Sequence, residues 1–382
     1  MIKGSFPIQK FENIQTPFYF YDTELLNKTL ACIKQESGKY NYKIHYAIKA
    51  NANETILDII KQEGLGVDCV SGGEIKAALK AGFHSNDIVF AGVGKADWEI
   101  ELALNADIFC FNVESTAELE IIDQIAKRLN KTAKVALRIN PNVDAHTHSY
   151  ITTGLNENKF GINLEQLQET IQLINRLDNI SLIGLHFHIG SQITDMSPFQ
   201  DLCIKINDIQ ADLKKTGITV SHINVGGGLG INYQHPNHIP MADFETYFKV
   251  FHEYLHLESW QTLHFELGRS VVAPCGSLIT KVLYIKEGTT KRFAIVDAGM
   301  TDLIRPALYG AYHHIENISS DKDFEKYDIV GPICESSDTF AKDYFLNETH
   351  RGDLLAIRSA GAYGEIMASK YNLRELPKSF FL

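Results

Sequence analysis

The sequence lacks any run of about 20 apolar residues, the length that an α-helix needs to cross a bilayer. Its first 22 residues also lack the apolar stretch and small-residue cleavage site of a signal peptide. Basic residues are the minority, with 36 Lys and Arg against 47 Asp and Glu, and the formal net charge of −11 makes a nucleic-acid backbone a poor partner. We therefore expect a cytoplasmic protein that binds neither membranes nor nucleic acids.

Cysteine is scarce and scattered. The six cysteines form no CxxC motif and no paired spacing, which argues against a zinc site and against a disulfide framework. Four of them sit in apolar surroundings, as small buried side chains do. Cys334 differs, because two carboxylates and two hydroxyls surround it in "GPICESSD". We predict no metal site.

What the sequence does contain is a regular alternation of short apolar runs and amphipathic helical stretches. A helical pattern at 22–36 precedes the first run. Continuous apolar strands, each followed by a helix, indicate a parallel sheet covered on its faces. The expected strands are 43–49, 65–71, 87–92, 107–112, 134–140, 182–190, 222–228 and 263–269. Eight such strands favour a (β/α)₈ TIM-type barrel, so the fold class is α/β, with the barrel over residues 22–270.

The pattern changes after Arg269. Runs such as "SLITKVLYIKEG", "KRFAIVDAG" and "GDLLAIRSAG" have strand composition without long helices between them. We expect a C-terminal β domain over residues 271–382, joined by the extended, aromatic segment 1–21. Its length lies within the usual range for a domain.

The chemically unusual residues fall at the carboxyl ends of the barrel strands, where barrel enzymes place their chemistry. They are Lys49, Asp68, His186, His188, Ser191, Gly226, Gly227, Gly228, Glu266 and Arg269. A desolvated lysine is a nucleophile for Schiff-base chemistry. A triple glycine that leaves a strand lets backbone N–H groups approach a phosphate. The two together indicate pyridoxal 5'-phosphate.

Two simpler interpretations of these motifs remain open. The glycines could form only a tight turn between strand and helix. The "HFH" pair, His186 and His188, could bind a catalytic metal with both imidazoles on one face, although no further ligand set is evident.

With these motifs in view, the chain resembles the fold type III pyridoxal-phosphate decarboxylases, and among them the branch that acts on meso-2,6-diaminopimelate. The matching stretches run in family order from about residue 16 to about residue 374. They are "YAIKAN", "VDCVSGGE", "THSYITTG", "KFGI", "GLHFHIGSQ", "VGGGLG", "ELGR", "DAGMTDLIRPALYGAYHHI", "CESSD" and "GAYGEIMASKYNLR". The resemblance implies decarboxylation to L-lysine and CO₂, the last step of lysine biosynthesis.

The resemblance assigns roles around the cofactor. Lys49 would be its covalent attachment point, which explains a lysine in an apolar strand. His188 would stack on the pyridine ring, and Glu266 would face the pyridine nitrogen. The other cofactor-binding residues would be Asp68, Ser191, Gly226, Gly227, Gly228, Gly268, Arg269 and Tyr363.

The resemblance also implies how the amino-acid substrate is held. Its carboxylates suit the planar fork of arginine. The substrate-binding residues would be Arg269, Arg305, Tyr309, Glu335, Ser336 and Tyr363. Cys334 would reprotonate the α-carbon, which makes it catalytic beside Lys49 and His188. In this family the "CESSD" segment comes from the second subunit, so we expect an obligate homodimer with shared active sites, in which the β domain contributes to the substrate site and the dimer interface.

Alternatives within the fold remain. A decarboxylase of ornithine, lysine or carboxynorspermidine would have an acidic residue near "LIRPALYG" to hold a distal amine, where this chain has Arg305 and Tyr309. A racemase would place an arginine where Glu266 lies. A non-catalytic relative would lack the β domain, Lys49 or Cys334.

Two departures from the family pattern lie near the C-terminal motifs. Leu267 replaces a proline in "ELGR", and Lys370 replaces an asparagine in "SKYN". The loop 146–161, which holds "THSYITTG", is expected to order when ligand binds.

Overall fold

The computed structural model describes residues 4–143 and 159–382 and divides the chain into two compact units. We call residues 30–230 and 243–268 the barrel unit. The β unit consists of the residues up to Thr29, of 231–242 and of 269–382. Most of the 146–161 loop, which we expect to order when ligand binds, lies outside the described residues. Within the described ranges, no helix is long and apolar enough to cross a membrane.

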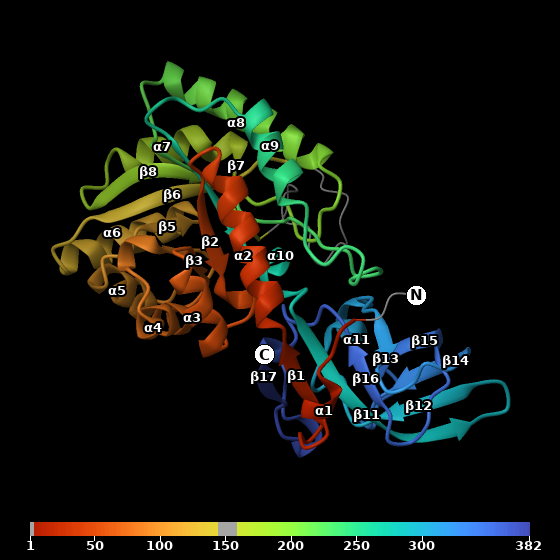
Figure 1. Ribbon diagram of the computed structural model, residues 1–382. Helices are drawn as coiled ribbons and strands as arrows, with labels where there is room; N and C mark the ends of the chain where they lie inside the picture. The colour runs from red at the N-terminus through yellow and green to blue at the C-terminus, as the bar shows by residue number, and fades with distance from the viewer. Residues whose placement is uncertain (1–3, 144–158) are drawn as a thin grey trace. The chain divides into compact units, whose positions relative to one another are not determined.

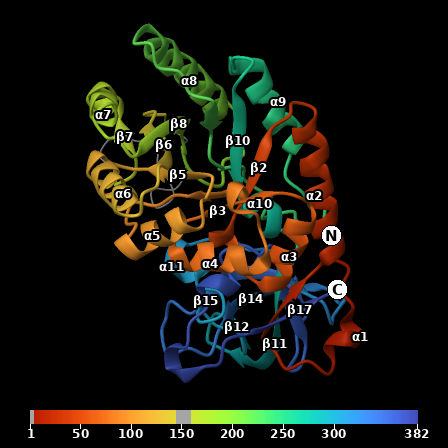
Figure 2. The same ribbon diagram turned by 90° about the vertical axis from the view of Figure 1, so that its left-hand side faces the viewer.

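Eight parallel strands close into a barrel in the barrel unit (Figures 1 and 2). In ring order they are β2 (Lys43–Ala47), β3 (Gly66–Cys69), β4 (Ile88–Phe90), β5 (Cys110–Val113), β6 (Ala133–Asn140), β8 (Ile180–His186), β9 (His222–Asn224) and β10 (Thr262–Leu267). Pairing of β10 with β2 and of β5 with β6 closes the ring, and the two-residue β7 (Ile162–Asn163) extends beside β6. All eight strands expected from the sequence are present, so the prediction of a (β/α)₈ barrel is confirmed.

Helices surround the strands, as Figure 2 shows. They are α2 (Thr23–Gly38), α3 (Glu54–Gln62), α4 (Gly72–Ala81), α5 (Asp97–Asn105), α6 (Thr116–Arg128), α7 (Leu167–Ile174), α8 (Ser197–Lys215) and α9 (Phe244–Tyr254). Helix α4 shows why they start so close to the strands. Ser71 Oγ accepts the N–H of Glu74, while Glu74 Oε2 accepts the N–H of Val70 at 2.7 Å. These paired bonds satisfy the first turn of the helix and fix the loop that follows β3.

The β unit contains eight strands in one twisted sheet. They are β1 (Phe18–Tyr21), β11 (Gly276–Glu287), β12 (Arg292–Val296), β13 (Ile315–Asn317), β14 (Phe324–Val330), β15 (Thr339–Asn347), β16 (Leu354–Ile357) and β17 (Lys378–Phe381). The first half of β11 pairs with β1 and β16, and its second half pairs with β12 after a register shift at Val282 and Tyr284. The two halves of this long strand thus have different neighbours, and the register shift marks the change. Because β1 pairs with β11 and β17, the N-terminal segment is part of this unit.

Aromatic side chains from the N-terminal segment pack into the core of the β unit. Phe11, Phe18 and Phe20 are buried with Ile279, and their rings meet edge to face at 5.2 Å. Short helices complete the unit, namely α1 (Ile8–Phe11), α10 (Arg269–Val272) and α11 (Arg305–Tyr309). The last two carry the arginines of the predicted site.

Candidate active site

Lys49 follows β2 in a single 3₁₀ turn, η1 (Ile48–Ala50), so it stands just beyond the strand and not in its last position. Its Nζ lies 3.9 Å from Oδ2 of Asp68, and its side chain is 44% exposed whereas that of Asp68 is 1% exposed. Neither carboxylate oxygen of Asp68 has a hydrogen-bond partner among the described residues. Burial, and then the charge of Glu266, raises the pKa of Asp68 well above its usual value. The lysine therefore stands beside a buried carboxyl group that a polar ligand could satisfy.

Glu266 in β10 is held inside the barrel by three side chains from three other strands, which we call the Glu266 clamp. Asn112 Nδ2 and Asn224 Nδ2 donate to Oε1 at 2.9 and 2.8 Å. His186 Nε2 lies 3.0 Å from Oε2. Burial alone would raise the pKa of Glu266, but His186 and its hydrogen bond, together with Lys49, lower it below the usual value. The clamp therefore keeps an ionised carboxylate in a fixed position.

The triple glycine begins two residues after the end of β9. Gly226 and Gly228 have φ values of +68° and +111°, which side-chain-bearing residues rarely adopt. A Cβ on Gly227 would lie 2.1 Å from the carbonyl oxygen of Glu266, so the turn has room only for backbone. Asn224 Oδ1 accepts the N–H of Gly226 at 2.8 Å. One asparagine thus links the glycine turn to the Glu266 clamp.

His188 and Ser191 lie beyond β8, which ends at His186. The Nδ1 atom of His188 accepts the N–H of Gly227 at 3.3 Å. Burial, then the charges of Arg138 and Lys49, lowers the pKa of His188 well below its usual value, so its ring is neutral. A neutral, half-buried imidazole beside the glycine turn suits stacking on an aromatic ligand.

These barrel residues fit pyridoxal 5'-phosphate. The bare backbone of the glycine turn suits a phosphate, and a buried ionised Glu266 suits a protonated pyridine nitrogen. Asp68 offers a buried carboxyl group without a hydrogen-bond partner in the described part of the chain. In the described ranges, no group of three or more His, Cys, Asp or Glu could hold a metal ion.

The β unit contains a buried arginine pair, Arg269 at the start of α10 and Arg305 at the start of α11. Both guanidinium groups donate to the phenol oxygen of Tyr233, at 2.8 and 3.0 Å. Arg305 also donates to His313 Nε2 at 3.2 Å. Such planar donors can bind a carboxylate in a bidentate manner.

The remaining predicted residues also lie in the β unit. The Tyr363 ring lies 5.0 Å from the Arg269 guanidinium, and Tyr363 has a φ of +57°. Tyr309 ends α11 and is half-buried. The segment with Cys334, Glu335 and Ser336 is exposed.

Hydrogen bonds anchor the chain around the exposed 334–336 segment. Asp338 accepts the N–H groups of Met300 and Ile333, each at 2.6 Å. Glu335 accepts the hydroxyl of Tyr371 at 2.7 Å. The thiol of Cys334 is therefore presented on a loop that is fixed from behind.

No role was predicted from the sequence for Asn112, Asn224, Tyr233 or His313. Asn112 and Asn224 were visible as polar residues within otherwise apolar strands, a pattern that needs explanation. His186 was noted in "HFH", yet its role as a partner of Glu266 was not predicted. Tyr233 lies in a loop and had no sequence signal.

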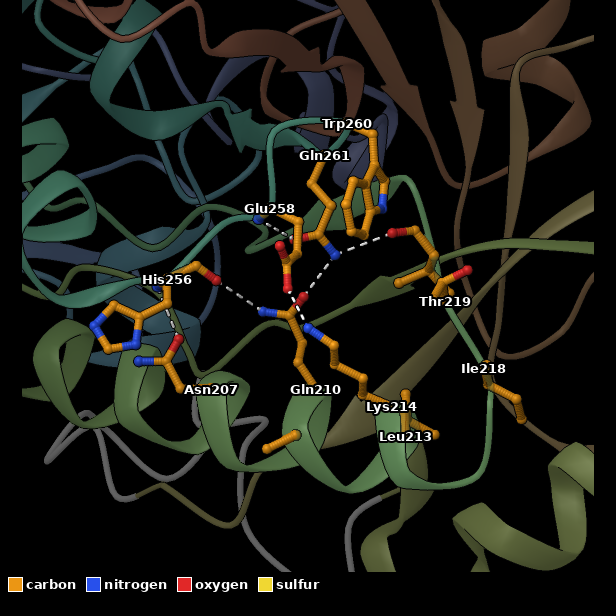
Figure 3. A pocket seen from close by; sticks show the side chains of 12 residues that line it. Asn207, Gln210, Leu213, Lys214, Ile218, Thr219, His256, Glu258, Trp260 and Gln261 are labelled. Carbon is orange, nitrogen blue, oxygen red and sulfur yellow. Dashed lines mark hydrogen bonds and ion pairs between the residues drawn. The ribbon is translucent and has the colours of Figure 1, made fainter.

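Figure 3 shows a separate cavity of about 240 Å³ on the barrel unit, between α8 and the segment before β10. It contains none of the predicted site residues. Its polar side chains bond to one another, for example Lys214 Nζ to Glu258 at 2.7 Å and Gln261 Nε2 to Gln210 Oε1 at 2.6 Å. These side chains are thus paired with one another and belong to no part of the predicted site.

Comparison with known proteins agrees with this geometry. Residues 24–273 match the model of the pyridoxal binding domain of pyridoxal-dependent decarboxylases. The chain is 62% identical over 380 residues to a diaminopimelate decarboxylase of Bacteroides thetaiotaomicron, covering 99% of this chain and 98% of that protein. A crystal structure of diaminopimelate decarboxylase from Helicobacter pylori complexed with L-lysine has a TM-score of 0.92 at 42% identity, covering 98% of this chain and 93% of that one. A lysine/ornithine decarboxylase from Vibrio vulnificus, at 21% identity and a TM-score of 0.84, covering 98% of this chain and 96% of that one, shares the fold.

Proposed function

Because this chain belongs to the pyridoxal-dependent decarboxylases, and within them to the diaminopimelate decarboxylases, we propose that it removes CO₂ from the D-configured centre of meso-2,6-diaminopimelate to give L-lysine. Pyridoxal 5'-phosphate is its cofactor. The observation that carries the choice of substrate is the buried arginine pair of the β unit, which suits a second carboxylate.

Residues of the barrel unit, with Arg269 and Tyr363 of the β unit, would hold the cofactor. When bound, pyridoxal phosphate supplies an electron sink for the charge that remains as CO₂ leaves. Lys49 would anchor it covalently and release it when the substrate amine arrives. Glu266 would keep the pyridine nitrogen protonated, and His188 would stack on the ring. Its phosphate and remaining edges would contact Asp68, Ser191, Gly226, Gly227, Gly228, Gly268, Arg269 and Tyr363.

Residues of the β unit would hold the substrate. Arg269, Arg305 and Tyr309 would bind the distal carboxylate. Glu335 would contact the distal ammonium, with Ser336 and Tyr363 completing the binding set. The Sγ–H of Cys334 would donate its proton to the α-carbon after CO₂ has left.

The substrate assignment is tested by product analysis. The cofactor-loaded protein is incubated separately with meso-diaminopimelate, L-ornithine and L-lysine, and the amines are followed by mass spectrometry. L-Lysine from diaminopimelate alone is the expected result. Putrescine or cadaverine formed at comparable rates would refute the assignment and favour an ornithine/lysine decarboxylase. The cytoplasmic location stays a prediction, which cell fractionation can test.

We further propose an obligate homodimer in which Cys334 acts in the site of the partner subunit, as the exposed 334–336 segment allows. Cys334→Ala should abolish turnover without releasing the cofactor. Lys49→Ala should be inactive for a different reason. If the sites are shared between subunits, subunit exchange between the two inactive variants should restore about a quarter of wild-type activity, because half the dimers are mixed and each mixed dimer has one intact site. Exchanged mixtures that stay inactive would contradict shared sites.

A further inference from the structure

Tyr233 joins the two arginines of the β unit. Its phenol oxygen accepts one N–H from Arg269 and one from Arg305, each from Nη1, at 2.8 and 3.0 Å. The Arg305 guanidinium also lies 5.3 Å from the Tyr233 ring. Burial would raise the pKa of Tyr233, but the two guanidinium charges lower it overall. The phenol oxygen is therefore strongly polarised toward both cations.

His313 fixes Arg305 from another direction. Its Nδ1 lies 2.8 Å from the carbonyl oxygen of Arg358, which can only accept, so Nδ1 carries the proton. The Nε2 lone pair is then left to accept the N–H of Arg305 at 3.2 Å. Burial, then the charge of Arg305, lowers the pKa of His313 to about 3, which keeps this imidazole neutral. The ring can therefore serve as an acceptor without repelling the guanidinium.

The positive charge of Arg305 is oriented but not neutralised by these contacts. Its side chain is buried, with 7% of the residue exposed, and in the described residues its hydrogen bonds go to Tyr233 and His313. A buried guanidinium whose partners are a phenol and an imidazole keeps its full charge and most of its five donors. Such a group is prepared for an anionic ligand.

We propose that Tyr233 and His313 are positioning residues that hold Arg269 and Arg305 in the geometry that selects substrates with a carboxylate at the distal end. This inference rests on the proposed function and adds the residues that determine its specificity. A directly bound carboxylate side chain in place of Tyr233 would have neutralised the arginines and competed with the substrate.

Tyr233→Phe tests the proposal, because it removes one oxygen and keeps the ring. Inhibition is measured with L-lysine, which keeps the distal carboxylate, and with cadaverine, which lacks it. We expect the inhibition constant of L-lysine and the KM for meso-diaminopimelate to rise about tenfold, since the hydrogen bonds at stake involve charged groups. The inhibition constant of cadaverine should stay within about twofold and kcat within about threefold.

Tyr344→Phe is the matched control. Tyr344 is a second hydrogen-bonded phenol of the β unit, accepting the N–H of Ile315 at 2.9 Å, and it has no role in substrate binding here. This variant should keep the wild-type ratio of the two inhibition constants. An equal rise for L-lysine and cadaverine in Tyr233→Phe would indicate general damage and overturn the proposal, as would no rise for either.

His313→Phe provides a second, independent variant. In this variant Arg305 keeps Tyr233 as an acceptor. We therefore expect a smaller rise in the inhibition constant of L-lysine, about threefold, and no change in the inhibition constant of cadaverine. A wild-type enzyme that forms no L-lysine from diaminopimelate refutes the proposed function, whereas normal turnover with unchanged selectivity in both variants refutes only the positioning role.

Discussion

The barrel unit and the β unit each hold charge in their interior, with opposite sign and by the same means. In the barrel, one carboxylate, Glu266, is held by two amides and an imidazole. In the β unit, the two guanidiniums of Arg269 and Arg305 are held by a phenol and an imidazole. In both places hydrogen-bonding side chains from other parts of the unit fix the direction of the charged group.

Ion pairs elsewhere in the molecule are built differently. Lys95 Nζ lies 2.6 Å from Glu118 Oε1, and both side chains are nearly buried. Lys95 Nζ also donates to the carbonyl oxygens of Gly92 and Asn112. There two opposite charges cancel, and the result supports the loop after β4. The Lys95–Glu118 pair thus serves the fold, while Arg305, whose partners are a phenol and an imidazole, is suited to binding an anion.

The largest effect should come from removing the charge at the centre of the Glu266 clamp. Glu266→Gln keeps the size of the side chain but cannot hold a protonated pyridine nitrogen. We expect kcat to fall by about 10²- to 10³-fold, the usual loss when a preorganised electrostatic partner is removed. Steady-state kinetics and the absorption spectrum of the bound cofactor would report it.

Glu118→Gln is the control for this comparison, because it alters another buried carboxylate of the barrel unit that pairs with Lys95. Its kcat should remain within about twofold of wild type. Similar losses in the two variants would mean that Glu266 has no special role.

A smaller effect should distinguish the roles of the two asparagines of the Glu266 clamp. Both Asn112 and Asn224 donate to Glu266, but only Asn224 also accepts the N–H of Gly226. Asn224→Ala should therefore raise the dissociation constant of pyridoxal phosphate about five- to tenfold, as expected for one or two lost hydrogen bonds. Asn112→Ala should leave it within about twofold. Fluorescence titration of the apoenzyme measures both constants, and equal constants would contradict a link between clamp and glycine turn.

The barrel was predictable because its strands are continuous apolar runs with helices between them. Each run can be recognised from neighbouring residues in the sequence, without knowledge of distant contacts. The positions of Lys49, just beyond β2, and of Glu266, near the end of β10, were predictable for the same reason, since the carboxyl ends of parallel strands share one rim. Family motifs then supplied roles that local patterns do not carry, as for Cys334 in an exposed loop.

The partners of these residues were not predictable. Asn112 and Glu266 are 154 positions apart in the chain, and Tyr233 and Arg305 are 72 apart. Their hydrogen bonds depend on register between distant segments, for which a single sequence has no periodic signal. The turn after β2 was missed for a simpler reason, because the apolar run continues through Ile48 while the backbone has already left the strand.

The smallest effect concerns pH and two buried histidines. Burial is the main cause that lowers the pKa of His222 in the barrel and of His313 in the β unit, each to about 3. A histidine with a lowered pKa in the folded state contributes stability that is present above the unfolded value of 6.5 and is lost as the pH falls from there toward about 3. At pH 5.5 each histidine should lower the free energy of unfolding by about 1.4 kcal/mol, which corresponds to a fall in Tm of roughly 3–6 °C.

The two histidines differ in their hydrogen bonds, so substitutions at the two positions should affect the Tm differently. In the described residues neither ring nitrogen of His222 has a hydrogen-bond partner, whereas His313 uses both nitrogens. His222→Leu should therefore keep the Tm at pH 7.5 close to wild type and reduce its fall at pH 5.5, because a titrating group is replaced without leaving a partner unsatisfied. His313→Phe should reduce the acid sensitivity as well, but should lower the Tm already at pH 7.5, because Arg305 loses an acceptor and the carbonyl of Arg358 loses its donor.

Thermal melts of the two variants at pH 7.5 and pH 5.5 measure both the Tm and its fall in acid. If both variants melt like wild type at pH 7.5, the hydrogen bonds of His313 do not stabilise the β unit; if neither reduces the acid sensitivity, other groups cause it.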